Sequence, residues 1–181
     1  RVNNLAGQPQ LTISDVRERF LKKSILPGKE NLRSIATTLL SFCMEWDLRN
    51  MLLDIRPIQG TAEPFFLHLF KGCVLFESLL RANPLNSPPL RDAKNHPLTL
   101  INVLQQLQIE LNIPNDLKIG ESDFPTILNE LNQLDTEHEC LTTAIEFTGK
   151  VRNSIGHNLG WDLQLTKIDY QRLFTMIALS N

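Results

Sequence analysis

A short stretch near the end of the chain combines residue types that could do chemistry on a phosphate group. Residues 150–157 read Lys-Val-Arg-Asn-Ser-Ile-Gly-His and bring Arg152, Asn153 and His157 within six positions. A guanidinium can bind a phosphate through two parallel hydrogen bonds and offset its negative charge. An imidazole titrates near neutral pH and can transfer a proton as a general acid or base. The Asn153 amide could hydrogen-bond the phosphate or orient the histidine.

The arginine of this stretch falls on the apolar side of its helix, where a charge needs a partner. Hydrophobic spacing predicts a helix over residues 136–156, with Arg152 inside its apolar stripe. A helix predicted over residues 61–82 carries Glu77 in the middle of its own stripe. Because a buried charge is costly unless paired, we expect Glu77 to bind Arg152. That pair would either stabilise the fold alone or also position Arg152 for chemistry; alternatively, Arg152 reaches past its neighbours to solvent.

The histidine does not automatically share a site with the arginine. His157 lies five residues after Arg152, so an uninterrupted helix would point it about 140° away. Gly156 could bring the two together by ending the helix with a positive φ and turning the chain. Alternatively, two subunits could contribute side chains to a common cleft at a twofold axis, which would require a homodimer.

The rest of the chain is predicted to be helical, since no alternating apolar run is typical of a strand. Further helices are expected over residues 31–55, 98–111 and 124–133, and a last one begins at Thr166 or Asp169. The fold class is therefore all-α, a single bundle of five to six helices.

The first long helix, residues 31–55, has apolar residues on two faces. Leu40, Met44, Leu48 and Met51 lie apart from the main stripe, so the helix is either central in the bundle or shared with a partner. Asn50 lies on the main stripe and could join the Glu77 cluster.

The domain boundary is predicted near residue 30. Residues 1–30 are irregular, with a possible short helix over residues 14–23, and read as an N-terminal segment or a linker from a preceding domain. Residues 31–181 read as one helical domain. The chain begins with Arg1, so we expect it to belong to a longer protein with a regulatory domain elsewhere.

The amino-acid composition and the net charge limit the functions that this protein could have. Hydrophobic residues make up 42% of the chain and the net charge is −2, so no global positive field would recruit nucleic acid. The three cysteines lie in apolar runs and are predicted to be buried free thiols. The sequence has no metal-ligand motif, signal peptide or membrane-spanning stretch, so we expect no metal, cofactor or membrane and a cytoplasmic setting.

The hexapeptide Arg152-Asn153-Ser154-Ile155-Gly156-His157 resembles the signature of the HEPN superfamily (higher eukaryotes and prokaryotes nucleotide-binding). That signature is an arginine, a following polar residue and a histidine a few residues on, at the end of a late helix in an all-α bundle. The segment Gly-Cys-Val-Leu-Phe-Glu-Ser-Leu-Leu also looks like the earlier HEPN helix that carries an acidic residue, here Glu77. The resemblance covers most of the chain, from about residue 31 onward.

The resemblance implies a metal-independent endoribonuclease that cleaves single-stranded RNA. The RNA 2′-hydroxyl would attack the adjacent phosphate, leaving a 2′,3′-cyclic phosphate and a 5′-hydroxyl. Arg152 and His157 would be catalytic, with Asn153 and Glu77 in support. A homodimer with a composite site, in a bacterial defence or toxin system, is expected.

The same arrangement of arginine and histidine occurs twice in this sequence, so the motif alone does not identify the site. Arg91-Asp92-Ala93-Lys94-Asn95-His96 also fits, but it lies in a proline-rich loop and its geometry is expected to be loosely held. We therefore favour Arg152 and His157. Arg91, Lys94 and His96 would form a mobile basic loop that contacts RNA, or would simply be solvated.

Two other functions remain open on sequence grounds. One is a non-catalytic HEPN-like helical module that binds a nucleotide or a partner, and the other is an all-α scaffold with an accidental motif. The presence of both Arg152 and His157 favours the ribonuclease. The slight negative charge disfavours tight general RNA binding but permits brief contact with unpaired RNA.

Overall fold

The computed structural model confirms an all-α architecture. It describes Glu18, Lys22 and residues 30–55, 62–82, 91–111, 117–134, 140–157 and 165–181, and these contain helices but no strand. The helices are α4 (Glu30–Ile55), α5 (Glu63–Ala82), α6 (Leu100–Leu111), α7 (Phe124–Gln133), α8 (Leu141–His157) and α9 (Lys167–Ser180). The short helix predicted over residues 14–23 lies outside the described residues apart from Glu18 and Lys22.

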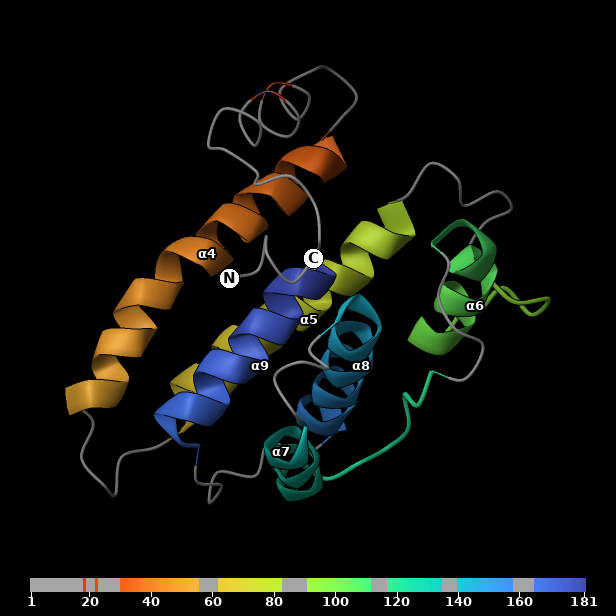
Figure 1. Ribbon diagram of the computed structural model, residues 1–181. Coiled ribbons are helices and arrows are strands. Elements are labelled where there is room, and N and C mark those ends of the chain that lie inside the picture. The colour runs from red at the N-terminus through yellow and green to blue at the C-terminus, as the bar shows by residue number, and fades with distance from the viewer. Residues whose placement is uncertain are drawn as a thin grey trace.

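Helix α5 occupies the middle of the bundle and contacts α4, α6, α8 and α9 (Figure 1). At Gly72 the neighbouring side chains come so close that an added Cβ would lie 2.5 Å from Ile177 Cγ2 and 2.6 Å from Phe42 Cε2. The absence of a side chain at this position therefore lets α4 and α9 pack directly on α5. Helix α4 forms one edge of the bundle, and α6 lies on the opposite side (Figure 1).

Local hydrogen bonds define two helix starts near the predicted positions. Asp123 caps α7, accepting a hydrogen bond from the Thr126 backbone N–H at 2.8 Å. Thr166, not Asp169, caps α9 by accepting from the Asp169 backbone N–H at 3.1 Å. Helix α8 begins at Leu141, later than the predicted residue 136, and Cys140 precedes it as non-helical chain.

The second apolar face of α4 is exposed. The face comprises Leu40, Met44, Leu48 and Met51 and continues to Ile55; Met44 is 77% exposed and Met51 63% exposed. Helix α4 is therefore not central in the bundle, and a partner on this face stays a prediction.

Two side-chain expectations are wrong. Cys73 is buried, but Cys43 and Cys140 are exposed, although all three are free thiols. Asn50 does not join the Glu77 cluster; its Oδ1 accepts a hydrogen bond of 2.7 Å from Gln171 on α9. Cys43 and Asn50 differ from expectation because a helical stripe gives the direction of a side chain but not the neighbour that it meets, and Cys140 differs because α8 begins after it.

A buried histidine joins three helices in the core. His68 on α5 lies with Nε2 2.8 Å from the Phe42 carbonyl oxygen on α4 and Nδ1 2.7 Å from the Tyr170 hydroxyl on α9. Burial lowers the pKa of His68, so the neutral ring is favoured. The neutral ring donates from Nε2 to the carbonyl and accepts at Nδ1 from the hydroxyl, which satisfies all three polar groups.

This arrangement predicts that the fold loses stability when the solution is mildly acidified. Because the folded-state pKa of His68 is lowered, its contribution is complete above the ordinary pKa of about 6.5 and is lost as pH falls below it. The free energy of unfolding should fall by up to about 1.4 kcal/mol per pH unit there. Urea unfolding between about pH 5 and 8 measures this slope.

The matched control is His68→Gln, which can keep both hydrogen bonds but does not titrate. Its slope should be smaller than that of the wild type. Glu45 does not interfere, because its hydrogen bond to Lys71 holds its pKa at about 2, so its contribution is lost only below about pH 4.5. Equal slopes in the two proteins would contradict the role of His68.

Candidate functional site

The predicted ion pair between α5 and α8 is present. Arg152 Nε lies 3.0 Å from Glu77 Oε2, and Arg152 Nη1 donates to Asn153 Oδ1 at 3.2 Å. The Glu77 side chain is 15% exposed and that of Arg152 is 34% exposed. The arginine is therefore held on its protein side by a nearly buried carboxylate, while part of the guanidinium stays open to solvent.

A second arginine, absent from the predicted site, binds the same carboxylate. Arg81 Nη2 lies 2.5 Å and Arg81 Nε 3.0 Å from Glu77 Oε1, and Nη2 also donates to the Leu98 carbonyl oxygen at 2.7 Å. A signal for it exists in the sequence, because Glu77 and Arg81 are four residues apart on one helix. The two arginines and one carboxylate leave this cluster with a net charge of +1.

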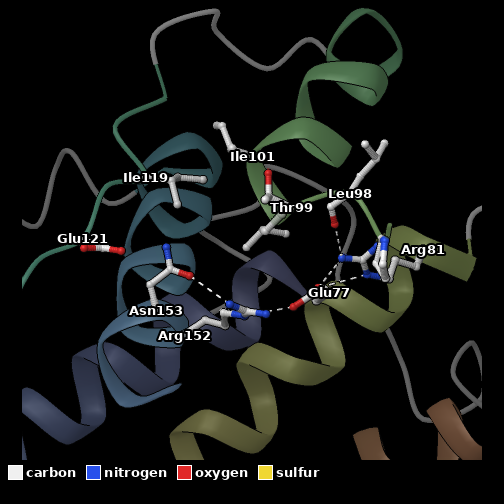
Figure 2. A pocket seen from close by; sticks show the side chains of 11 residues that line it. Glu77, Arg81, Leu98, Thr99, Ile101, Ile119, Glu121, Arg152 and Asn153 are labelled. Atoms are coloured by element: carbon white, nitrogen blue, oxygen red, sulfur yellow. Dashed lines mark hydrogen bonds and ion pairs between the residues drawn. The ribbon is translucent and has the colours of Figure 1, made fainter. Parts of the chain in front are cut away.

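The cluster forms one side of an open pocket of about 520 Å³. Arg81, Glu77, Arg152 and Asn153 form a continuous polar row, and Thr99, Ile101 and Ile119 lie across from it (Figure 2). The remaining lining residues are Pro97, Leu98, Leu100 and Glu121.

The apolar wall of the pocket is positioned by packing behind it. Leu100, Val103 and Leu104 of α6 are buried against Phe76 and Leu80 of α5, which holds the segment before α6 beside Arg81.

On the other side of the pocket, Gly149 lets the segment 117–121 approach α8. A Cβ at Gly149 would lie 2.6 Å from Ile119 Cγ2, so any larger residue would displace this wall. The pocket therefore depends on contacts between segments that are distant in the sequence.

The expectation that Gly156 turns His157 toward Arg152 is wrong. Helix α8 continues through Gly156 to His157, and Gly156 does not adopt a positive φ. Along an uninterrupted helix, five residues correspond to about 7.5 Å of rise and a rotation of about 140°. The backbone of His157 belongs to α8, and its side chain lies outside the described part of the structure.

Local hydrogen bonds shape the alternative copy of the motif in the loop before α6, while its predicted mobility stays a prediction. Asp92 Oδ1 accepts hydrogen bonds of 2.8 Å from the backbone N–H groups of Lys94 and His96. Arg91 Nη1 donates to the Asn95 carbonyl oxygen at 2.8 Å, and Asn95 has a φ of 64°. These side chains are exposed, and the loop continues directly into Pro97 and Leu98 of the pocket. An RNA contact here stays a prediction.

Comparisons with protein-family models, curated proteins and solved structures returned no match. Within the described ranges, no group of three or more His, Cys, Asp or Glu side chains is arranged to hold a metal ion. No described helix has the length and apolar character needed to cross a membrane. The function must therefore be inferred from the chemistry of the pocket.

The shared carboxylate predicts unequal effects of removing its partners. Glu77→Gln should lower the free energy of unfolding by about 1–3 kcal/mol, because it leaves two neighbouring guanidinium groups without their counter-charge. Arg152→Gln should cost less, since Glu77 keeps Arg81. Chemical denaturation of both variants measures the difference.

The matched control removes an exposed carboxylate that also forms an ion pair with a basic side chain. Asp54→Asn breaks a surface pair with Lys167, in which Asp54 is 57% exposed, and should cost at most about 1 kcal/mol. If Glu77→Gln were no more destabilising than Asp54→Asn, Glu77 would not be the central charge of the site.

Proposed function

We propose that this chain is a metal-independent endoribonuclease domain that acts on single-stranded RNA, with Arg152 as its phosphate-binding residue. The observation that carries the proposal is the geometry of Arg152: Glu77 holds one edge of the guanidinium, and the rest borders the pocket. A pre-positioned guanidinium stabilises charge developing on a phosphate without first having to reorganise. The sequence resemblance to HEPN domains supplies the reaction type.

In the proposed reaction, the RNA 2′-oxygen attacks the adjacent phosphorus while the bond to the 5′-oxygen breaks. Arg152 offsets the charge that builds on the non-bridging oxygens. Asn153 already accepts from Arg152 through Oδ1, which leaves its NH₂ group to donate to the phosphate. His157 either accepts the proton of the 2′-hydroxyl or donates one to the leaving 5′-oxygen, and water carries out the other of these two proton transfers. The products are a 2′,3′-cyclic phosphate and a 5′-hydroxyl.

The proposed enzyme acts as a homodimer with a composite site. Helix α8 runs through Gly156 without the turn that would bring His157 to Arg152 of the same chain, so a second copy supplies the histidine in this proposal. The exposed face of α4 does not serve this purpose, since α4 lies at one edge of the bundle and α8 on the other side of α5 and α9 (Figure 1). The shared contact is proposed at the C-terminal end of α8.

The wider setting of the proposal is a bacterial defence or toxin system in the cytoplasm.

A second candidate is a non-catalytic module that binds a nucleotide or a partner. It is favoured by the composition of the pocket, whose lining joins arginines to apolar side chains. This module would bind the same phosphate through Arg152 and would not cleave RNA.

Cleavage of labelled single-stranded RNA in EDTA tests the nuclease. Wild type should cut, Arg152→Ala should be slower by about 10²–10³-fold, and His157→Ala by about 10²–10⁴-fold. Asp54→Asn, which changes an exposed carboxylate outside the pocket, is the control and should retain the wild-type activity. A wild type that binds RNA but does not cut it would favour the second candidate.

Mixing two inactive variants tests whether the site is composite. Arg152→Ala and His157→Ala, combined under conditions that allow subunit exchange, should recover part of the wild-type rate, because a mixed dimer contains one intact pair. Each variant alone should stay inactive. If the mixture remained as inactive as its parts although mixed dimers formed, both residues would have to act within one chain.

A further inference from the structure

The pocket contains more binding groups than a single phosphate-binding arginine requires. Arg81 enters it from α5, Thr99 adds a hydroxyl, and two isoleucines cover the side opposite the charges (Figure 2). The proposed reaction uses Arg152, Asn153 and His157 and leaves these groups without a role.

We propose that this pocket is a subsite for one unpaired nucleotide of a polynucleotide strand, with Arg81 as a second phosphate-binding residue. The phosphodiester would bind to Arg81 and Arg152, and the base would lie against Ile101 and Ile119. This inference deepens the proposed function and rests on it for the placement of the phosphate at Arg152.

The net charge of the cluster formed by Arg81, Glu77 and Arg152 determines whether a singly or a doubly charged phosphate fits the pocket better. Arg81 and Arg152 carry two positive charges, and Glu77 removes one, so the cluster matches the single negative charge of a phosphodiester. A terminal phosphate close to −2 would exceed this balance, and Glu121, which brings the formal charge of the whole lining to zero, would repel it more strongly than a phosphodiester. The pocket should therefore favour a phosphate within a strand over a terminal one.

Hydrogen-bonding capacity remains on both arginines. Arg152 uses Nε for Glu77 and one hydrogen of Nη1 for Asn153, and Arg81 uses Nε and Nη2 for Glu77 and Leu98. A guanidinium has five N–H donors, so each arginine can donate further to a ligand. Glu77 holds both groups in place, which reduces the side-chain entropy that binding would otherwise cost.

The size and polarity of the pocket suit one nucleotide rather than a duplex. A pocket of about 520 Å³ falls in the range of roughly 300–1,000 Å³ that holds a small organic ligand. Ile101 and Ile119 offer apolar surface to a base removed from its stack, while Thr99 could hydrogen-bond its polar edge. A paired base could not enter, so the subsite would restrict the enzyme to unpaired RNA.

The test measures binding without cleavage. The probe is a dinucleoside monophosphate whose sugar lacks the attacking 2′-hydroxyl, titrated by calorimetry or NMR against the full chain. Wild type should bind it, and Arg81→Ala should weaken binding at least about tenfold. Arg81→Lys, which keeps the charge but not the planar fork, should fall between them. Lys167→Ala, which removes a positive charge outside the pocket, should bind like wild type.

Two further measurements separate the base and the phosphate. Ile119→Ser should weaken binding of the dinucleotide but not of dimethyl phosphate, which has no base. The 5′-mononucleotide should bind more weakly than the dinucleotide at pH values where its phosphate is doubly charged. Equal binding by Arg81→Ala, or a preference for the mononucleotide, would overturn the proposal.

The outcomes distinguish this subsite from the nuclease itself. If RNA is cut at the same rate by wild type and folded Arg81→Ala and both bind the dinucleotide equally, the subsite is wrong and the nuclease stands. If binding depends on Arg81 but wild type cuts no RNA, the subsite stands and the nuclease is wrong.

Discussion

One carboxylate in the interior of the bundle determines how the functional groups are arranged. Glu77 receives hydrogen bonds from Arg81 on its own helix and from Arg152 on α8. A carboxylate that is mostly buried is costly unless such partners satisfy it, so it constrains both arginines. The same bonds that lower this cost leave two guanidinium groups beside the open pocket, so a structural requirement and the proposed binding site coincide there.

Glu77 can hold both arginines only because α5 lies in the middle of the bundle, in contact with the helices around it. Close packing at Gly72 and the buried His68 attach α5 to α4 and α9, and the cluster around Phe76 attaches it to α6. The charged end of α5 is therefore placed against α8 and the segment before α6 by contacts that carry no charge. Apolar packing sets the distance between the helices. The ion pairs then set the orientation of the charged side chains that lie between them.

The uninterrupted course of α8 limits the mechanisms that the site can support. A helix that continued only to Arg152 would leave the following residues free to fold back, but α8 extends to His157. The turn at Gly156 that would bring His157 to the arginine of the same chain is therefore absent. For this reason the proposed catalysis requires a second copy, whereas phosphate binding in the pocket requires one chain alone.

Much of the fold could be predicted from the sequence, because the spacing of apolar residues reveals a helix and local hydrogen bonds determine where it begins. The bounds of α7 and the pairing of Glu77 with Arg152 follow from neighbours in the chain or from the cost of burying charge, whereas the sequence left the start of α9 open between Thr166 and Asp169.

The tertiary structure alone decided the pocket itself, in which Leu98 and Ile119 meet residues far away in the sequence. It also decided the exposure of Cys43 and the helical state of Gly156. These features depend on which segments lie side by side, and periodicity along one helix carries no information about that.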